Sequence, residues 1–185
     1  MLELVETAVA SALAPEAGRT YLAVLEAWGR AHLCKGRACL DLGGAHFPVG
    51  WKGMDAVFRE FPGAFFRASL WPRTWEDGTM DPRKTRIKSL VPLAAPPQAR
   101  YAFYARGRLL AVDPAEGLLT LEVRPNPRGR LREPFALTLV ASLELLLSLP
   151  EPGGGIRVEG EYRPARGRLV ARAAHPVPLW DDPTP

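Results

Sequence analysis

Four side chains that could bind a metal ion, those of His32, Cys34, Cys39 and His46, lie within a stretch of fifteen residues. A transition metal needs nitrogen and sulfur ligands that converge at about 2 Å. Two neighbouring strands could place His32 opposite Cys39, and the diglycine turn that follows could place Asp41 opposite His46. In that arrangement the side chains on one outward face are those of His32, Cys39, Asp41 and His46. A metal site on that face is one interpretation of the cluster.

The cysteines also have a simpler interpretation. The spacing H-x-C-x4-C-x6-H matches no strong zinc pattern, and a free cysteine usually behaves as a small buried apolar residue. Cys34 and Cys39 are too close together to build a disulfide framework and suit a reducing compartment. We therefore treat both as thiols and assign no cofactor and no metal, leaving open whether His32, Cys34, Cys39 and His46 bind one.

A second kind of chemistry is indicated by the stretch "LWPRTW", residues 70–75. Exposed aromatic rings stack on nucleobases, worth about 1–3 kcal/mol per base, and cations beside them attract phosphate without reading sequence. Trp71 and Trp75 flank Arg73 here, and an acid-free run with four more cations follows at 83–88. Aromatic residues also commonly fill the core of β proteins, so core packing and ligand binding both stay open for the two tryptophans.

Other basic residues lie in two further loops. Lys35 and Arg37 flank a turn, and Arg124, Arg128, Arg130 and Arg132 lie among prolines and glycines. These loops could contact phosphate or simply be solvated. The net charge is +4, with 24 Lys and Arg against 20 Asp and Glu. Arginine-rich, amide-poor composition is also typical of a GC-rich genome or a hot habitat, so basicity alone is weak evidence for a nucleic-acid partner.

An internal repeat organises the elements that must position these residues. Segments 21–93 and 101–179 follow one plan: three strands, a short helix, two strands and a similar close, "LVPL" against "PVPL". Apolar and polar residues alternate with period two in the strands, as in "IRVEGEYR". The helices are expected at 54–61 and 142–149, with Asp55 and Ser142 as N-caps. A further apolar stripe predicts an N-terminal helix over residues 1–18.

This order of elements resembles the OB-fold, a five-stranded, partly open Greek-key barrel with a helix between its third and fourth strands. The resemblance is one of topology and covers most of the chain twice. It implies an all-β protein with short helices: a helix at 1–18, OB-like barrels at 19–95 and 99–180, and an acidic, Pro-rich tail at 181–185 that we expect to fray.

Tandem OB-fold proteins of the single-strand-binding type suggest what such barrels do. They use the face of strands two and three, and the loops after strands one and four, to bind oligonucleotides or oligosaccharides. The loop after strand four is long in the first unit, over residues 72–84, and short in the second. Binding explains this extra length more easily than folding does. We therefore expect non-catalytic binding of single-stranded DNA or RNA, mainly by the first barrel.

The expected binding residues combine two stacking platforms with cations. They are Trp71 and Trp75, with Arg73, Arg83, Lys84, Arg86, Lys35, Arg37, Arg128 and Arg130. The alternative is a protein-interaction scaffold or a subunit of a larger assembly, docking through the Pro-rich surface or the C-terminal tail. No glycine-rich phosphate loop or G-x-S-x-G motif is present, so we do not expect an enzyme. The chain has no apolar run of membrane-spanning length and no basic leader, which favours a cytoplasmic protein without membrane partners.

Overall fold

The computed structural model describes residues 17–98 and 101–182 and is mostly β-sheet. The predicted N-terminal helix therefore lies almost entirely outside the described residues. In chain order the elements are η1 (Ala17–Arg19), β1 (Leu22–Cys34), β2 (Arg37–Asp41), β3 (His46–Pro48), α2 (Met54–Glu60), β4 (Phe65–Trp71), β5 (Arg86–Leu93), β6 (Ala102–Asp113), β7 (Leu118–Val123), β8 (Phe135–Val140), α3 (Leu143–Leu147), β9 (Gly155–Arg163), η2 (Pro164–Arg166) and β10 (Arg168–Pro176). Within the described part of the chain, no helix is both long and apolar enough to cross a bilayer.

The second half of the chain forms a closed ring of paired strands. β6 pairs with β7, β7 with β8, β8 with β10, β10 with β9, and β9 again with β6. All of these pairs are antiparallel except β8 with β10, where Val140 pairs with Val170 in parallel, so the sheet is mixed. Alternate side chains of the ring point inward and are fully buried, among them Phe103, Leu121 and Ile156.

The first half has the same strand order with one difference. Its strands run β3, β2, β1, β4, β5, and no ladder joins β3 to β5 among the described residues. Leu25, Leu40 and Phe47 form its fully buried interior. Phe58 of α2 is also buried there and packs on Phe66 with the ring centroids 5.2 Å apart, so the short helix closes one end of this core.

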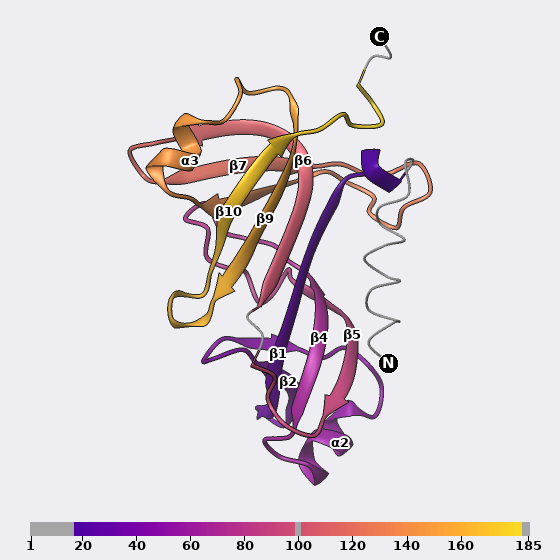
Figure 1. Cartoon of the computed structure of the whole chain (residues 1–185). Helices are drawn as coiled ribbons and strands as arrows, with labels where there is room; N and C mark the ends of the chain where they lie inside the picture. The colour runs from indigo at the N-terminus through magenta and orange to yellow at the C-terminus, as the bar shows by residue number, and fades with distance from the viewer. Residues whose placement is uncertain (1–16, 99–100, 183–185) are drawn as a thin grey trace.

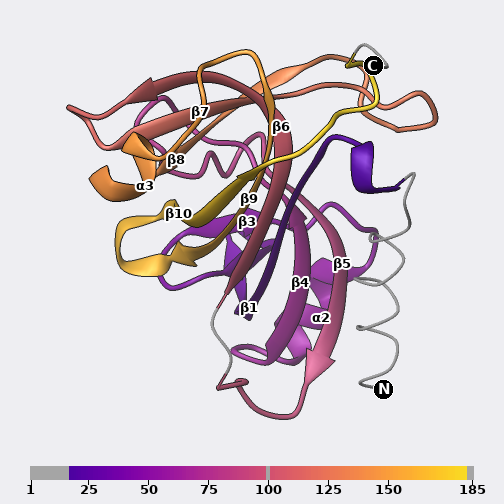
Figure 2. The ribbon, with the colours of Figure 1, turned by 45° about the horizontal axis from the view of Figure 1, so that its top comes forward.

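β1 joins the two halves into one sheet. Its first residues pair with β6, with Leu22 opposite Arg106, and its later residues pair with β4 and then with β2. Figures 1 and 2 both show β1 and β6 side by side where the halves meet. Gly29 allows β1 to approach the second strand closely, because a Cβ at this position would lie 2.5 Å from the carbonyl oxygen of Asp41.

One predicted helix cap is confirmed and the other is wrong. Ser142 caps α3 by accepting a hydrogen bond from the backbone N–H of Leu145. Asp55 does not cap α2, because the cap position is Gly53, in the left-handed region with φ 88°. The carboxylate of Asp55 instead accepts the N–H of Ala38 and pairs with Arg37, which ties the helix to β2.

The long loop between β4 and β5 folds against the second half of the molecule. Its backbone exchanges hydrogen bonds with Gly167 after η2 and with the start of β10, from Met80 N–H to the carbonyl of Gly167 and from Leu169 N–H to the carbonyl of Gly78. Thr74 accepts the N–H of Thr138 on β8. Met80 is buried. We expected that ligand binding, more than folding, explains the length of this loop. For its central residues this expectation is wrong, because they connect the two halves of the molecule.

Residues 181 and 182 at the end of the described chain are packed, although we expected residues 181–185 to fray; residues 183–185 lie outside the described residues. Asp181 accepts hydrogen bonds from Tyr21 and Arg108, at 2.8 and 3.1 Å, and also pairs with Arg124. Asp182 pairs with Arg108 at 2.8 Å. These carboxylates are thus engaged within the chain.

Candidate functional site

The first tryptophan of the "LWPRTW" stretch lies at the end of β4 with a lysine above its ring. Trp71 is half-buried, and Lys88 Nζ lies 5.5 Å from its ring centroid. Arg86 is the residue opposite Trp71 in the β4–β5 ladder. Side chains of directly paired residues project from the same face, so the ring and two cations share one part of the surface.

The second tryptophan is more exposed and has a similar neighbour. Trp75 is 49% exposed, and Lys84 Nζ lies 5.9 Å from its ring centroid. The backbone N–H groups of Arg83 and Lys84 both donate to the carboxylate of Asp81, which is 1% exposed. The buried aspartate thereby holds the turn that presents these cations, while the side chains of Arg83 and Lys84 remain exposed.

We name the group formed by Trp71, Trp75, Arg83, Lys84, Arg86 and Lys88 the tryptophan–lysine surface. Arg86 Nη1 donates to the carbonyl of Arg83 at 3.0 Å, which links the loop to the start of β5. From Pro82 to Leu93 the sequence contains no acid. The surface therefore combines two indole rings with four cations, the residue types that bind a single-stranded polyanion carrying flat bases.

Arg73 is placed differently from the prediction. Its guanidinium carbon lies 3.3 Å from the centroid of the Phe135 ring, and its side chain is half-buried. Burial, and then the nearby charge of Arg86, lower the pKa of Arg73 below its usual value. Its Nη1 donates to the carbonyl of Pro72. Arg73 thus serves the packing between the two halves, and its assignment as a phosphate ligand is not supported by its position.

Lys35 and Arg37 lie away from the tryptophan–lysine surface. They flank the β1–β2 turn, where Cys34 pairs with Arg37, whereas Leu25 pairs with Leu70 beside Trp71. The nine steps from Leu25 to Cys34 correspond to about 30 Å of strand. Arg37 also pairs with Asp55, Nε to Oδ2, at 3.0 Å, so part of its charge is neutralised.

Arg128 and Arg130 are exposed on the loop between β7 and β8. This loop ends at Phe135, the ring beneath Arg73, so it adjoins the β4–β5 loop at that point. Arg124 at its beginning pairs with Asp181 and Glu122 and is therefore engaged within the protein. Apart from Arg73, the predicted residues thus fall into three groups: the tryptophan–lysine surface, the β1–β2 turn and the β7–β8 loop.

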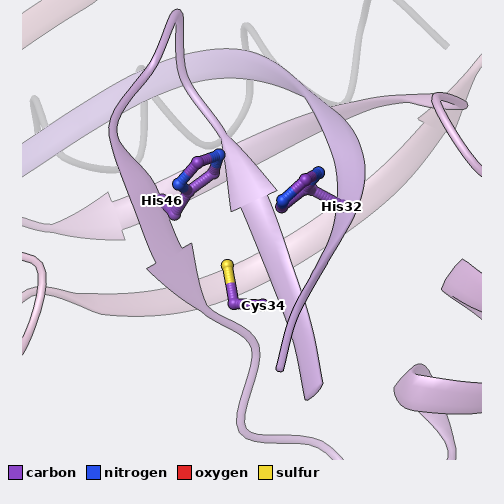
Figure 3. Close-up of side chains that lie close together, drawn as sticks. All are labelled: His32, Cys34 and His46. Carbon is purple, nitrogen blue, oxygen red and sulfur yellow. The ribbon is translucent and has the colours of Figure 1, made fainter. Parts of the chain in front are cut away.

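A separate cluster lies on the outer face of β1, β2 and β3. As predicted, His32 pairs with Cys39 and Asp41 pairs with His46. The potential ligand atoms of His32, Cys34 and His46 all lie within 4.8 Å of one another. The two imidazole rings are nearly parallel, with centroids 4.5 Å apart. Figure 3 shows the Sγ of Cys34 directed toward the space between the two rings. We call these three residues the histidine–cysteine cluster.

Cys39, which the strand pairing places on the same face, is buried at 4% exposure. Burial raises the pKa of its thiol to about 11, and a hydrogen bond with Cys34 contributes in the same direction. The partly exposed thiol is Cys34, which lies two residues after His32 on β1 and so shares its face. The i, i+2 spacing of a strand could have added Cys34 to the face of His32, but the burial of Cys39, which leaves Cys34 as the more accessible thiol, depends on packing.

A cavity between the two halves was not anticipated from the sequence. It has a volume of about 350 Å³ and is lined by Trp28, Arg30 and Asp41 with the Gly43–Gly44 turn and Tyr101. Trp28 stacks on Tyr101 with centroids 5.6 Å apart, and burial followed by the charge of Asp41 raises the pKa of Tyr101. These residues come from β1, the turn after β2 and the start of the second repeat, so no local motif could have indicated them.

No protein-family model matches the chain, and no curated protein has significant sequence similarity to it. Lys88 is the main addition that the structure makes to the predicted surface. Its place in the acid-free run was evident, but its position over Trp71 depends on the pairing of β4 with β5, in which Trp71 is opposite Arg86.

Proposed function

We propose that the protein binds single-stranded nucleic acid, without catalysis, on the tryptophan–lysine surface. The observation that carries this proposal is the pair of indole–ammonium contacts, Trp71 with Lys88 and Trp75 with Lys84. An indole offers a face on which any base can stack. The lysine ammonium that lies over each ring here would move off that face when a base stacks and would reach the phosphate of the same nucleotide. Arg83 and Arg86 add charge on the same path.

The strand pairing supports an OB-like architecture for each half as part of this proposal. The order three strands, helix, two strands, together with the closed ring of the second half, is the arrangement expected of an OB-fold. The tryptophan–lysine surface then lies in and after the loop between the fourth and fifth strands of the first half, one of the loops with which such barrels bind oligonucleotides. The proposal needs only this surface; the β7–β8 loop would extend it.

The test is fluorescence anisotropy of labelled single-stranded DNA, single-stranded RNA and duplex, titrated with protein at several salt concentrations. We expect single strands to bind more tightly than duplex, with a log–log salt slope of several times about −0.7. Trp75→Ala should weaken binding by about 1–3 kcal/mol if one base stacks on it. The matched control is Trp51→Ala, because Trp51 is similarly exposed, at 40%, but lies in the loop before α2.

Two results would contradict nucleic-acid binding at this surface. One is an absence of binding at the lowest salt concentration, where phosphate contacts are strongest. The other is an equal effect of Trp75→Ala and Trp51→Ala, which would mean that the indole of Trp75 makes no specific contribution. Circular dichroism of both variants would show whether they keep the fold of the parent protein.

A protein-interaction role is the second candidate, favoured by exposed apolar side chains around α2. Trp51, Val57 and Phe61 are 40, 37 and 54% exposed. Val57 is on α2, and Phe61 caps the end of that helix, with its N–H donating to the carbonyl of Val57. An apolar interface is little affected by salt, whereas nucleic-acid binding weakens steeply with it. Partner capture that persists at high salt and is lost in Trp51→Ala but not in Trp75→Ala would favour this role.

A further inference from the structure

We propose that His32, Cys34 and His46 form a binding site for a divalent transition-metal ion, with Zn²⁺ as the ion that fits best. The proposal is independent of nucleic-acid binding, because the histidine–cysteine cluster lies on the outer face of β1–β3 and shares no residue with the tryptophan–lysine surface. It starts from the one observation that the strand pairing brings three ligating side chains to a single point.

The spacing of the ligand atoms fits a metal centre after a small adjustment. Ligands of tetrahedral zinc at bond lengths of about 2.0–2.3 Å lie about 3.4–3.7 Å from one another. The ligand atoms of the histidine–cysteine cluster lie within 4.8 Å of one another without an ion. Because His32 and His46 are exposed and Cys34 is only partly buried, rotation of the side chains can close the remaining difference without moving the sheet.

The sheet supplies the rigidity that a metal site needs. His32 and Cys34 are two residues apart on β1 and therefore project on the same side, and His46 projects from β3 on the far side of β2. The backbone of β2 is paired on both edges, so the three Cα positions are held by two antiparallel ladders. The centroids of the two imidazole rings lie 4.5 Å apart, so a side-chain rotation is enough to direct a nitrogen of each ring toward a shared ion.

The donor set selects the ion. Two imidazoles and one thiolate are too soft for Mg²⁺ or Ca²⁺, which prefer oxygen ligands, and imidazole with thiolate is typical of zinc sites. Three protein ligands leave a fourth tetrahedral position for water. Asp41, opposite His46 in the β2–β3 ladder, could accept a hydrogen bond from the ring nitrogen of His46 that does not bind the metal.

The local charge does not oppose a cation at this point. Arg37, on the same face of β2, pairs with Asp55 at 3.0 Å. The carboxylate of Asp41 adds a negative charge, although one of its oxygens already accepts the N–H of Gly44. Arg30, opposite Asp41 in the β1–β2 ladder, is a second arginine on this face, and its guanidinium lies over the ring of Phe65. Two arginines and two carboxylates thus surround the cluster, so the electrostatic cost of bound Zn²⁺ with one thiolate, which has a net charge of +1, is modest.

The experiment uses the full chain without an affinity tag and measures Zn²⁺ binding by competition with a chromophoric chelator. We expect one Zn²⁺ per chain, with binding at least about tenfold weaker in Cys34→Ser and in His46→Ala. His175→Ala is the matched control, because His175 is an exposed histidine on β10 in the other half, and this variant should bind zinc like the parent protein. Failure of the parent protein to bind zinc at micromolar concentration would overturn the proposal, as would unchanged binding in both cluster variants.

Cobalt substitution gives a second readout, and its deciding result comes from the parent protein. Co²⁺ bound by a thiolate has a sulfur-to-metal charge-transfer band in the near ultraviolet, and tetrahedral Co²⁺ has intense visible bands. We expect both features in the parent protein, and loss of the charge-transfer band in Cys34→Ser. A cobalt spectrum without a charge-transfer band in the parent protein would overturn the assignment of Cys34 as a ligand and with it the proposed site.

Discussion

The guanidinium of Arg73 lies 3.3 Å above the ring of Phe135, which joins the loop after β4 to the first residue of β8. This contact lies between the two halves of the molecule, beside the tryptophan–lysine surface. It explains why Arg73, the cation of the "LWPRTW" stretch, differs from the two lysines that follow. Lys84 and Lys88 lie over exposed or partly exposed rings, whereas Arg73 is half-buried in the packing between the halves.

Replacing Arg73 should destabilise the protein. A partly buried cation over an aromatic face contributes about 0.5–2 kcal/mol, so we expect Arg73→Ala to lower the free energy of unfolding by an amount in that range. Arg59→Ala is the control, because Arg59 is an exposed arginine on α2. Urea denaturation followed by tryptophan fluorescence measures both. Equal changes in the two variants would show that the Phe135 contact contributes nothing specific.

Lys88 should contribute one phosphate contact if the proposed nucleic-acid surface is correct. Single-strand binding loses a log–log salt slope of about 0.7 for each phosphate contact removed, so we expect Lys88→Gln to make the slope less steep by about that amount. Lys52→Gln, a change at an exposed lysine before α2, should leave the slope unchanged. The anisotropy titrations described above supply the slopes, and an unaltered slope in Lys88→Gln would argue against contact between Lys88 and phosphate.

The packed end of the chain predicts a pH-dependent loss of stability. Burial alone would raise the pKa of Asp181, but hydrogen bonds from Tyr21 and Arg124 and the charge of Arg108 outweigh it, so the pKa lies below its usual value. A carboxyl whose pKa is lower in the folded protein stabilises the fold above its unfolded pKa, about 3.9. This contribution is lost as the pH falls through the folded pKa.

Asp181→Asn tests this contribution. Because the side chain is mostly buried and accepts charge-assisted hydrogen bonds, we expect a loss of about 1–3 kcal/mol at pH 7. The difference between the parent protein and the variant should shrink as the pH falls below 4, as measured by thermal melts from pH 2 to 8. Glu151→Gln, at an exposed acid, is the control. A difference that stays constant across this pH range would mean that ionisation of Asp181 does not contribute.

Gly29 should be difficult to replace. A Cβ at this position would lie 2.5 Å from Asp41 O and 2.7 and 2.8 Å from side-chain carbons of Leu42 and Leu40, so the β1–β2 contact would have to open. Overpacking of this kind costs about 1–3 kcal/mol, and we expect Gly29→Ala to lower stability by this amount. Gly50→Ala, at a position with no atom within 4 Å of the added carbon, should change stability by less than about 0.5 kcal/mol. Comparable denaturation midpoints for the two variants would contradict the expected steric effect.

What the sequence determined by itself was local. Period-two alternation located the strands, such as β9 with its buried Ile156, Val158 and Tyr162, because a strand shows its two faces at alternate residues. The cap at Ser142 was also predictable, because a side-chain hydroxyl and a backbone N–H three residues later need no distant partner. The pairing of His32 with Cys39 and of Asp41 with His46 followed from short turns whose length sets the register.

Contacts between segments far apart in the chain could not be predicted from the sequence. The pairing of β1 with β6, the burial of Met80 against the second half and the position of Arg73 over Phe135 each depend on how two repeats pack. Asp55 illustrates the same limit at short range, because its carboxylate binds β2 instead of capping its own helix. The physical reason is that alternation and capping act over a few residues, whereas packing between repeats depends on the shapes of both surfaces at once.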